Sequence, residues 1–143
     1  MILNLTQHPA TPDQKAAGVV DLEGKNLERL KELLTFDSIE VAVKQRFDRS
    51  RQIANLVSSI KLAGDEESLH EDGTAIHVMI GGAPYLMAPL ENVLTKDNRV
   101  PVYAFSVRES VEQIQSDGSV IKKNIFKHGG FVESPKDEGG EVK

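Results

Sequence analysis

The sequence contains no cysteine and no tryptophan, and only 5% of its 143 residues are aromatic. Without cysteine the chain can form no disulfide, bind no metal through thiolates and use no cysteine nucleophile. The scarcity of aromatic side chains argues against a stacking platform for single-stranded nucleic acid. No apolar run approaches the roughly 20 residues that span a bilayer, and the N-terminus lacks the layout of a secretory signal. We therefore expect a cytoplasmic protein that does not enter a membrane.

Acidic residues outnumber basic ones, 22 to 17, and the net charge is −5. This balance disfavours binding of long nucleic acid through a broad basic surface, but it allows a small anionic ligand in a local pocket. The hydrophobic fraction of 39% is that of an ordinary globular domain. We expect a single domain over residues 1–133, a mobile acidic loop at 64–73 and a disordered, charged tail at 134–143.

The pattern of apolar residues predicts strands that alternate with helices. Strands are expected at 2–5, 75–80 and 100–105, and helices at 12–18, 26–34, 39–62 and 85–94. Thr11 and Ser38 are the expected helix caps, and Val19–Leu22 is expected to be an extended link. An Asp-Gly pair within 116–119 predicts a hairpin. This order indicates an α/β fold, a small Rossmann-like parallel sheet flanked by helices on both faces, with a C-terminal β-hairpin at the sheet edge or projecting from it.

Polar or glycine-rich segments follow each of the three predicted strands. They are Thr6-Gln7-His8, Gly81-Gly82-Ala83-Pro84 and Ser106-Val107-Arg108. Because the carboxyl ends of parallel strands meet at one edge of a sheet, we expect these segments to converge. The glycine backbone can approach an anion closely, and an arginine can clamp a phosphate. Hydroxyl and amide groups can contact a ribose or base, and a histidine suits acid, base or anion-binding work. The sequence therefore predicts a nucleotide or phosphate pocket.

Each of these candidate site residues can also have a purely structural role. Gly81-Gly82 lacks the third glycine of a dinucleotide fingerprint and can be an ordinary tight turn. Arg108 can form a surface ion pair with Glu109, and His8 can cap its own turn. His128 is a further ligand-binding candidate, because the glycines after it allow a ligand to approach. No histidine pair has the spacing of a metal site, so neither a metal nor another cofactor is expected.

The turn Gln7-His8-Pro9-Ala10-Thr11-Pro12-Asp13-Gln14 resembles that of small CRISPR-associated proteins with CARF-like Rossmann folds. Several members of those families are ring nucleases of antiviral defence, which degrade the cyclic oligoadenylate second messengers of type III systems. The later Gly-Gly-Ala-Pro turn and the Val-Tyr-Ala-Phe-Ser-x-Arg strand end are compatible with that layout. The resemblance is sharpest over the first fourteen residues, and it does not extend to the hairpin of residues 111–132.

The resemblance implies a homodimer that cleaves the cyclic ligand without a metal, by attack of a ribose 2′-hydroxyl on the adjacent phosphorus. His8 would be the acid or base, or would donate a hydrogen bond to the phosphate if protonated, and Arg108 would hold the phosphate. The sugar would be positioned by Thr6, Gln7 and Ser106, and the Gly81-Gly82 backbone would cradle the anion.

Three functions therefore remain open. The chain can be a metal-independent ring nuclease, or a non-catalytic module that senses or sequesters a nucleotide in the same pocket. It can also be an interaction protein whose arginine-rich helix face, Lys44 to Arg51, docks a partner or the sister subunit.

Overall fold

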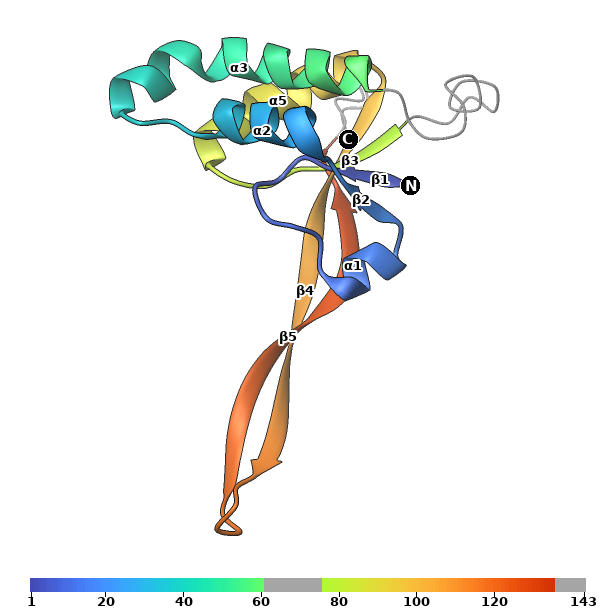
Figure 1. Cartoon of the computed structure of the whole chain (residues 1–143), viewed down its shortest axis with the longest axis vertical. Helices are drawn as coiled ribbons and strands as arrows, with labels where there is room; N and C mark the ends of the chain where they lie inside the picture. The colour runs from blue at the N-terminus through green and yellow to red at the C-terminus, as the bar shows by residue number, and fades with distance from the viewer. Residues whose placement is uncertain (61–75, 136–143) are drawn as a thin grey trace, which may run out of the picture.

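The protein folds into a five-stranded sheet with helices packed against it (Figure 1). The structure is a computed structural model that describes residues 1–60 and 76–135. The strands are β1 (Ile2–Asn4), β2 (Val19–Asp21), β3 (Ile76–Met79), β4 (Arg99–Ile114) and β5 (Val120–Glu133). The helices are α1 (Pro12–Ala16), α2 (Gly24–Leu34), α3 (Ile39–Ser59) and α5 (Pro84–Lys96). The strand order is β2-β1-β3-β4-β5, with β1 to β4 parallel and β5 antiparallel to β4. The predicted α/β class and the Rossmann-like sheet are confirmed.

Local capping explains where two of the helices begin. Thr11 accepts a hydrogen bond from the backbone N–H of Gln14 at 3.1 Å, and the Gln14 side chain accepts one from the Thr11 N–H at 3.0 Å. This reciprocal capping box satisfies two N–H groups that a helix start leaves unpaired. Ser38 caps α3 by one bond only, in which its side chain accepts from the N–H of Val41 at 3.2 Å. Both predicted caps are confirmed.

The two faces of the sheet are covered unequally. The longer helices α2, α3 and α5 lie on one face, and the short α1 lies on the other (Figure 1). The main core fills the first interface and includes Leu3, Leu5, Leu30, Ile53, Ile80 and Leu90, all at most 2% exposed. A smaller cluster of Ala10, Val19, Met79 and Val102 lies on the second face. Burial of both faces explains why β1 and β3 are mostly apolar, with Asn4 and His77 as their polar members.

The segment expected to be an extended link, Val19–Leu22, instead contributes a strand. Its residues Val19–Asp21 form β2, which pairs in parallel with β1 in the register Ile2 opposite Val19. A segment of three residues is too short for its apolar pattern to distinguish a strand from an extended link. The hydrogen bonds to β1 make it a strand.

The predicted strand end at Ser106-Val107-Arg108 is wrong. β4 continues through these residues to Ile114 and pairs with β5 along its length, with an irregularity between Phe105 and Ser106. The predicted hairpin is confirmed, with its turn closed by a 2.7 Å bond from the Gln115 N–H to the Ser119 carbonyl. Antiparallel partners on β5 satisfy the backbone groups of the polar stretch that face β5, which is why the stretch does not end the strand.

Four sequence-based expectations fall wholly or partly outside the described residues. They concern the acidic loop at 64–73, the end of the helix predicted to reach residue 62, the start of the strand predicted at residue 75, and the tail from residue 136 onward.

Candidate functional site

A cavity of about 660 Å³ opens at the carboxyl ends of β1 and β3. The chain leaves β1 through α1 toward β2 on one side, and it leaves β3 through α5 toward β4 on the other side. In open α/β sheets, such a reversal of direction leaves a crevice between the two strands, and ligands bind there. The volume lies within the roughly 300–1,000 Å³ of typical small-molecule sites.

The lining of this pocket divides into a polar rim and an apolar floor. Thr6, Gln7 and His8 come from the loop after β1, and Gly81 and Gly82 come from the loop after β3. The floor and far wall are formed by Leu34, Met79, Ile80, Leu86, Tyr103 and Ala104. The structure thus brings together five predicted site residues, from two loops separated by more than seventy positions in the chain.

Asn4 holds the loop after β1 in its shape. Its side chain is 3% exposed, and its Oδ1 accepts hydrogen bonds from the Thr6 N–H at 2.9 Å and the Thr6 hydroxyl at 2.7 Å. Its Nδ2 donates to the His8 carbonyl at 2.9 Å and to Oδ1 of Asp21 at 2.8 Å. Asp21 also accepts from the N–H of Ala10 at 3.0 Å. Two polar side chains absent from the predicted site therefore fix the loop that carries Thr6, Gln7 and His8.

The glycine pair brings the second loop close to the first. A Cβ built on Gly81 would lie 3.6 Å from the Cγ2 of Thr6, so the two loops are in near contact there. Gly82 has φ +137°, a conformation that side chains with a Cβ rarely adopt. The pair then leads into α5, whose first residue is Pro84. The backbone bends at Gly82, and the glycine pair forms one wall of the pocket.

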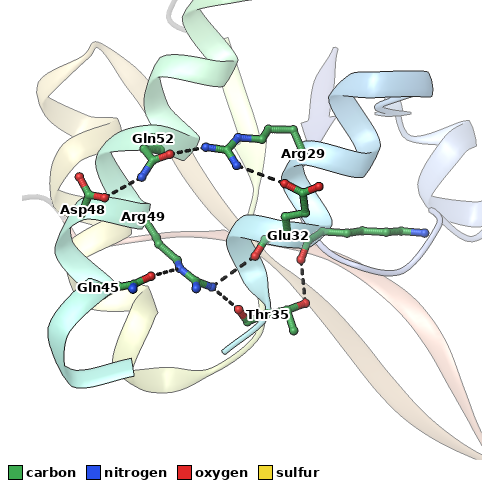
Figure 2. Close-up of polar contacts among 8 residues, drawn as sticks. Arg29, Glu32, Thr35, Gln45, Asp48, Arg49 and Gln52 are labelled. Carbon is green, nitrogen blue, oxygen red and sulfur yellow. Dashed lines mark hydrogen bonds and ion pairs between the residues drawn. The ribbon is translucent and has the colours of Figure 1, made fainter. Parts of the chain in front are cut away.

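Gln7 is tied to a polar network between α2 and α3. Its Nε2 donates to the Thr35 hydroxyl at 3.4 Å, and that hydroxyl donates to the Lys31 carbonyl at 2.7 Å. Arg49 of α3 donates to the carbonyls of Thr35 and Glu32 at the end of α2 (Figure 2). A cation at this position compensates both the unpaired carbonyls and the negative end of the helix dipole. Gln7 of the pocket lining is therefore hydrogen-bonded to the end of α2, which Arg49 of α3 stabilises.

The arginines of the α3 face make contacts within the chain. Arg49 donates to the Thr35 carbonyl, and Arg51 pairs with Asp97, the residue that follows α5. Arg46 donates to the Val43 carbonyl at 3.1 Å and lies 4.9 Å from the centre of the Phe47 ring. These bonds give the predicted arginine-rich face a structural role, and they weaken the case for it as a docking surface.

Tyr103 enters the pocket from β4 and was not among the predicted site residues. Its hydroxyl donates a hydrogen bond to the carboxylate of Glu91 on α5. Burial, and then the hydrogen bond and negative charge of Glu91, raise the pKa of Tyr103 well above its usual range. Tyr103 is therefore a neutral donor in the pocket wall at neutral pH, and it does not act as a base.

Replacing Tyr103 by phenylalanine is expected to lower stability by about 1 kcal/mol at neutral pH, because the bond to Glu91 is lost. The raised pKa means that the folded protein holds the phenolic proton more tightly than the unfolded chain. The stability that this tighter proton binding gives the folded state is fully present below pH 10.0, the ordinary pKa of tyrosine. It is lost as the pH rises further. The stability difference between wild type and Tyr103→Phe should therefore shrink in urea titrations above pH 10. The exposed Tyr85→Phe is the matched control, and a difference that stays constant from pH 7 to 11 would contradict this assignment.

Three predicted site residues lie away from the pocket lining. Arg108 is in the middle of β4, exposed, with its guanidinium 5.8 Å from the centre of the Phe126 ring. Ser106 pairs with His128 across the hairpin, and the His128 ring packs edge-on against Phe131 at 5.0 Å. The strand that was expected to deliver Ser106 and Arg108 to the pocket continues past it. Tyr103 and Ala104 are the β4 residues that the topology places there.

Neither a metal cluster nor a membrane helix is found in residues 1–60 and 76–135. No three or more histidine or acidic side chains of that part of the chain gather as metal ligands. In the same part, no helix is long and apolar enough to cross a bilayer.

The fold and the pocket define a small Rossmann-like α/β protein with a candidate ligand site at the reversal point of its sheet. The chain belongs to the Uncharacterized protein MJ1673 family, whose model matches residues 1–132. No curated protein and no solved structure matches it.

Proposed function

We propose that this protein binds a small anionic nucleotide, of the cyclic oligoadenylate class, in the pocket between β1 and β3. The observation that carries the proposal is the position of the pocket at the reversal point of the sheet, with a polar rim over an apolar floor. A nucleotide needs both kinds of surface, because its base is largely apolar and its phosphate and ribose are polar.

Each part of such a ligand has a matching part of the pocket. An adenine base would pack against the more exposed apolar lining residues Leu34, Tyr103 and Ala104. The phosphate fits beside Gly81 and Gly82, where the backbone is open and the positive end of the α5 dipole lies. Thr6 and Gln7 offer a hydroxyl and an amide to the ribose or to the base edge.

Cleavage of the same ligand is the second candidate, and His8 favours it. His8 lies on the rim, exposed, and histidine is the residue that most often moves protons near neutral pH. In this reaction the ribose 2′-oxygen forms a bond to phosphorus as the bond from phosphorus to the 5′-oxygen breaks. The 2′-hydroxyl gives up its proton and the leaving 5′-oxygen gains one, which yields a linear product with a 2′,3′-cyclic phosphate. His8 would accept or donate one of these protons.

Calorimetry with cyclic tri-, tetra- and hexa-adenylate tests binding, and chromatography of the same mixtures in EDTA tests cleavage. Saturable binding with intact ligand supports a sensor or sequestering module. Conversion to linear product in EDTA supports the ring nuclease. If none of the three rings binds or raises the thermal midpoint at saturating concentration, the proposal is wrong, because a ligand that binds the folded state must stabilise it.

Substitution of His8 by alanine separates the two candidates. If His8 moves a proton, the cleavage rate should fall at least about a hundredfold, while affinity changes by less than about tenfold. His77→Ala is the matched control, because His77 is on β3, outside the pocket lining, and lies 3.6 Å from Glu133. Equal cleavage rates in the two variants would rule out His8 as the acid or base.

A further inference from the structure

The distal part of the hairpin projects from the domain as an arm (Figure 1). We define the arm as residues 106–114 of β4, the turn 115–119 and residues 120–128 of β5. By register, Val107, Val111, Ile121 and Ile125 share one face of the arm, where each lies opposite a charged or polar residue of the other strand. Ile121 is 47% exposed and Val107 is also 47% exposed. Two strands alone are marginally stable in water, whereas three or more strands with a hydrophobic face are stable. We therefore expect a further strand, paired with the arm, to stabilise it.

The outer edge of β4 is open for pairing along the arm. Among the described residues, β3 pairs with β4 only as far as Val102, and beyond that point β4 pairs with β5 alone. An unpaired strand edge presents a row of N–H and carbonyl groups that can template another strand.

The two edges of the arm differ in how well they are protected. β5 carries Lys122, Lys123 and Lys127, and lysines on an edge strand oppose pairing with another chain. Residues 106–114 of β4 contain no lysine, and their charges are Arg108, Glu109 and Glu112. Pairing is therefore favoured at the β4 edge.

We propose that the β4 edge of the arm pairs antiparallel with the same edge of a second copy of this chain, centred on Ser110. A two-fold axis perpendicular to the paired strands requires one residue to lie opposite its own copy, and every other residue then has a fixed partner. With Ser110 at the centre, Arg108 lies opposite the partner's Glu112, and Glu112 lies opposite the partner's Arg108. Oppositely charged cross-strand pairs stabilise a sheet.

Neighbouring registers lack this charge complementarity. A centre at Arg108, Glu109 or Glu112 places a charge directly opposite its own copy, which destabilises a strand pair. A centre at Val111 avoids that repulsion but places Arg108 opposite the partner's Ile114. The register centred on Ser110 is the one that forms both ion pairs and joins two arms into a four-stranded sheet.

This register also connects the arm with the pocket. Ala104, which lines the pocket, falls opposite the partner's Ser116 at the start of the turn. Each arm would thus reach the rim of the other copy's pocket. The pairing itself does not depend on the proposed function, and its test uses no ligand.

A single cysteine tests the pairing directly, because the natural chain has none. Residues directly opposite in an antiparallel pair have Cα atoms about 4.5–5.5 Å apart, within the range of a disulfide. Mild oxidation of Ser110→Cys should therefore convert most of the protein to a covalent dimer on non-reducing gels. Asn124→Cys is the matched control, since Asn124 lies opposite Ser110 within the arm but on β5.

A charge exchange tests the register. Arg108→Glu should weaken the dimer at least about tenfold in sedimentation equilibrium. Adding Glu112→Arg together with Lys122→Glu should restore it, because Lys122 lies opposite Glu112 within the arm and its exchange keeps that pair oppositely charged. The proposal is overturned if the wild-type chain sediments as a 15.7 kDa monomer at micromolar concentration. It is also overturned if Asn124→Cys crosslinks as readily as Ser110→Cys, or if the triple variant dimerises as weakly as Arg108→Glu.

Discussion

Replacement of Asn4 by alanine should lower the free energy of unfolding by about 2–4 kcal/mol and weaken nucleotide binding at least about tenfold. The buried amide of Asn4 accepts from both the N–H and the hydroxyl of Thr6, and it donates to the His8 carbonyl and Asp21. Alanine leaves the Thr6 N–H without its partner and removes one of the two hydrogen bonds that the His8 carbonyl and Oδ1 of Asp21 each accept. It also leaves a small cavity between β1 and β2. The thermal midpoint should fall by roughly 10 °C, measured by calorimetry.

The matched control for this substitution is Asn55→Ala. Asn55 is exposed on α3, and its side chain accepts a 3.2 Å hydrogen bond from the Nε of Arg51. We expect that variant to change stability by less than about 0.5 kcal/mol and to leave binding unaltered. If Asn4→Ala kept the midpoint and affinity of the wild type, the loop after β1 would not depend on this network.

Replacement of Gly82 by alanine should cost about 1–3 kcal/mol of stability and reduce ligand affinity more than tenfold. The backbone of Gly82 has φ +137°, so a Cβ forces the loop to a different conformation. The same loop forms the wall against which the phosphate is placed, so its shift affects binding as well as folding. Urea unfolding and calorimetric titration of one sample measure the two effects.

Gly18→Ala distinguishes backbone strain from a change in the pocket. Gly18 has φ +103° and follows α1, outside the pocket lining. Its substitution should cost a similar amount of stability without a comparable loss of affinity. If Gly18→Ala and Gly82→Ala weakened binding equally, the effect at Gly82 would reflect global destabilisation.

The sequence correctly predicted the helix starts and the hairpin turn, which depend on interactions between residues a few positions apart. Thr11 with Gln14, and Ser38 with Val41, define helix starts within a single turn, so the caps could be identified from their spacing. The Asp-Gly turn of the hairpin was recognised for the same reason. The strand state of Val19–Asp21 depends instead on pairing with β1, and that of residues 106–110 depends on pairing with β5, so neither follows from the apolar pattern within the segment itself.

The same distinction explains which parts of the candidate site were found. Gln7, His8 and the glycine pair follow obvious apolar strands, and the rule for parallel sheet edges placed them together. The role of Asn4 depends on Asp21, seventeen positions away, and that of Tyr103 depends on Glu91 of another element. Arg108 was misplaced because a polar stretch in a long antiparallel strand reads like a strand end.

The most direct test of the central claim is a titration of the ¹⁵N-labelled protein with a cyclic oligoadenylate, followed by amide chemical shifts. Binding at the reversal point of the sheet predicts the largest shifts at Thr6, Gln7, Gly81 and Gly82, with small shifts on the outer face of α3. A saturable titration whose largest shifts lie elsewhere, or no shifts at saturating ligand, would contradict the assignment of this pocket.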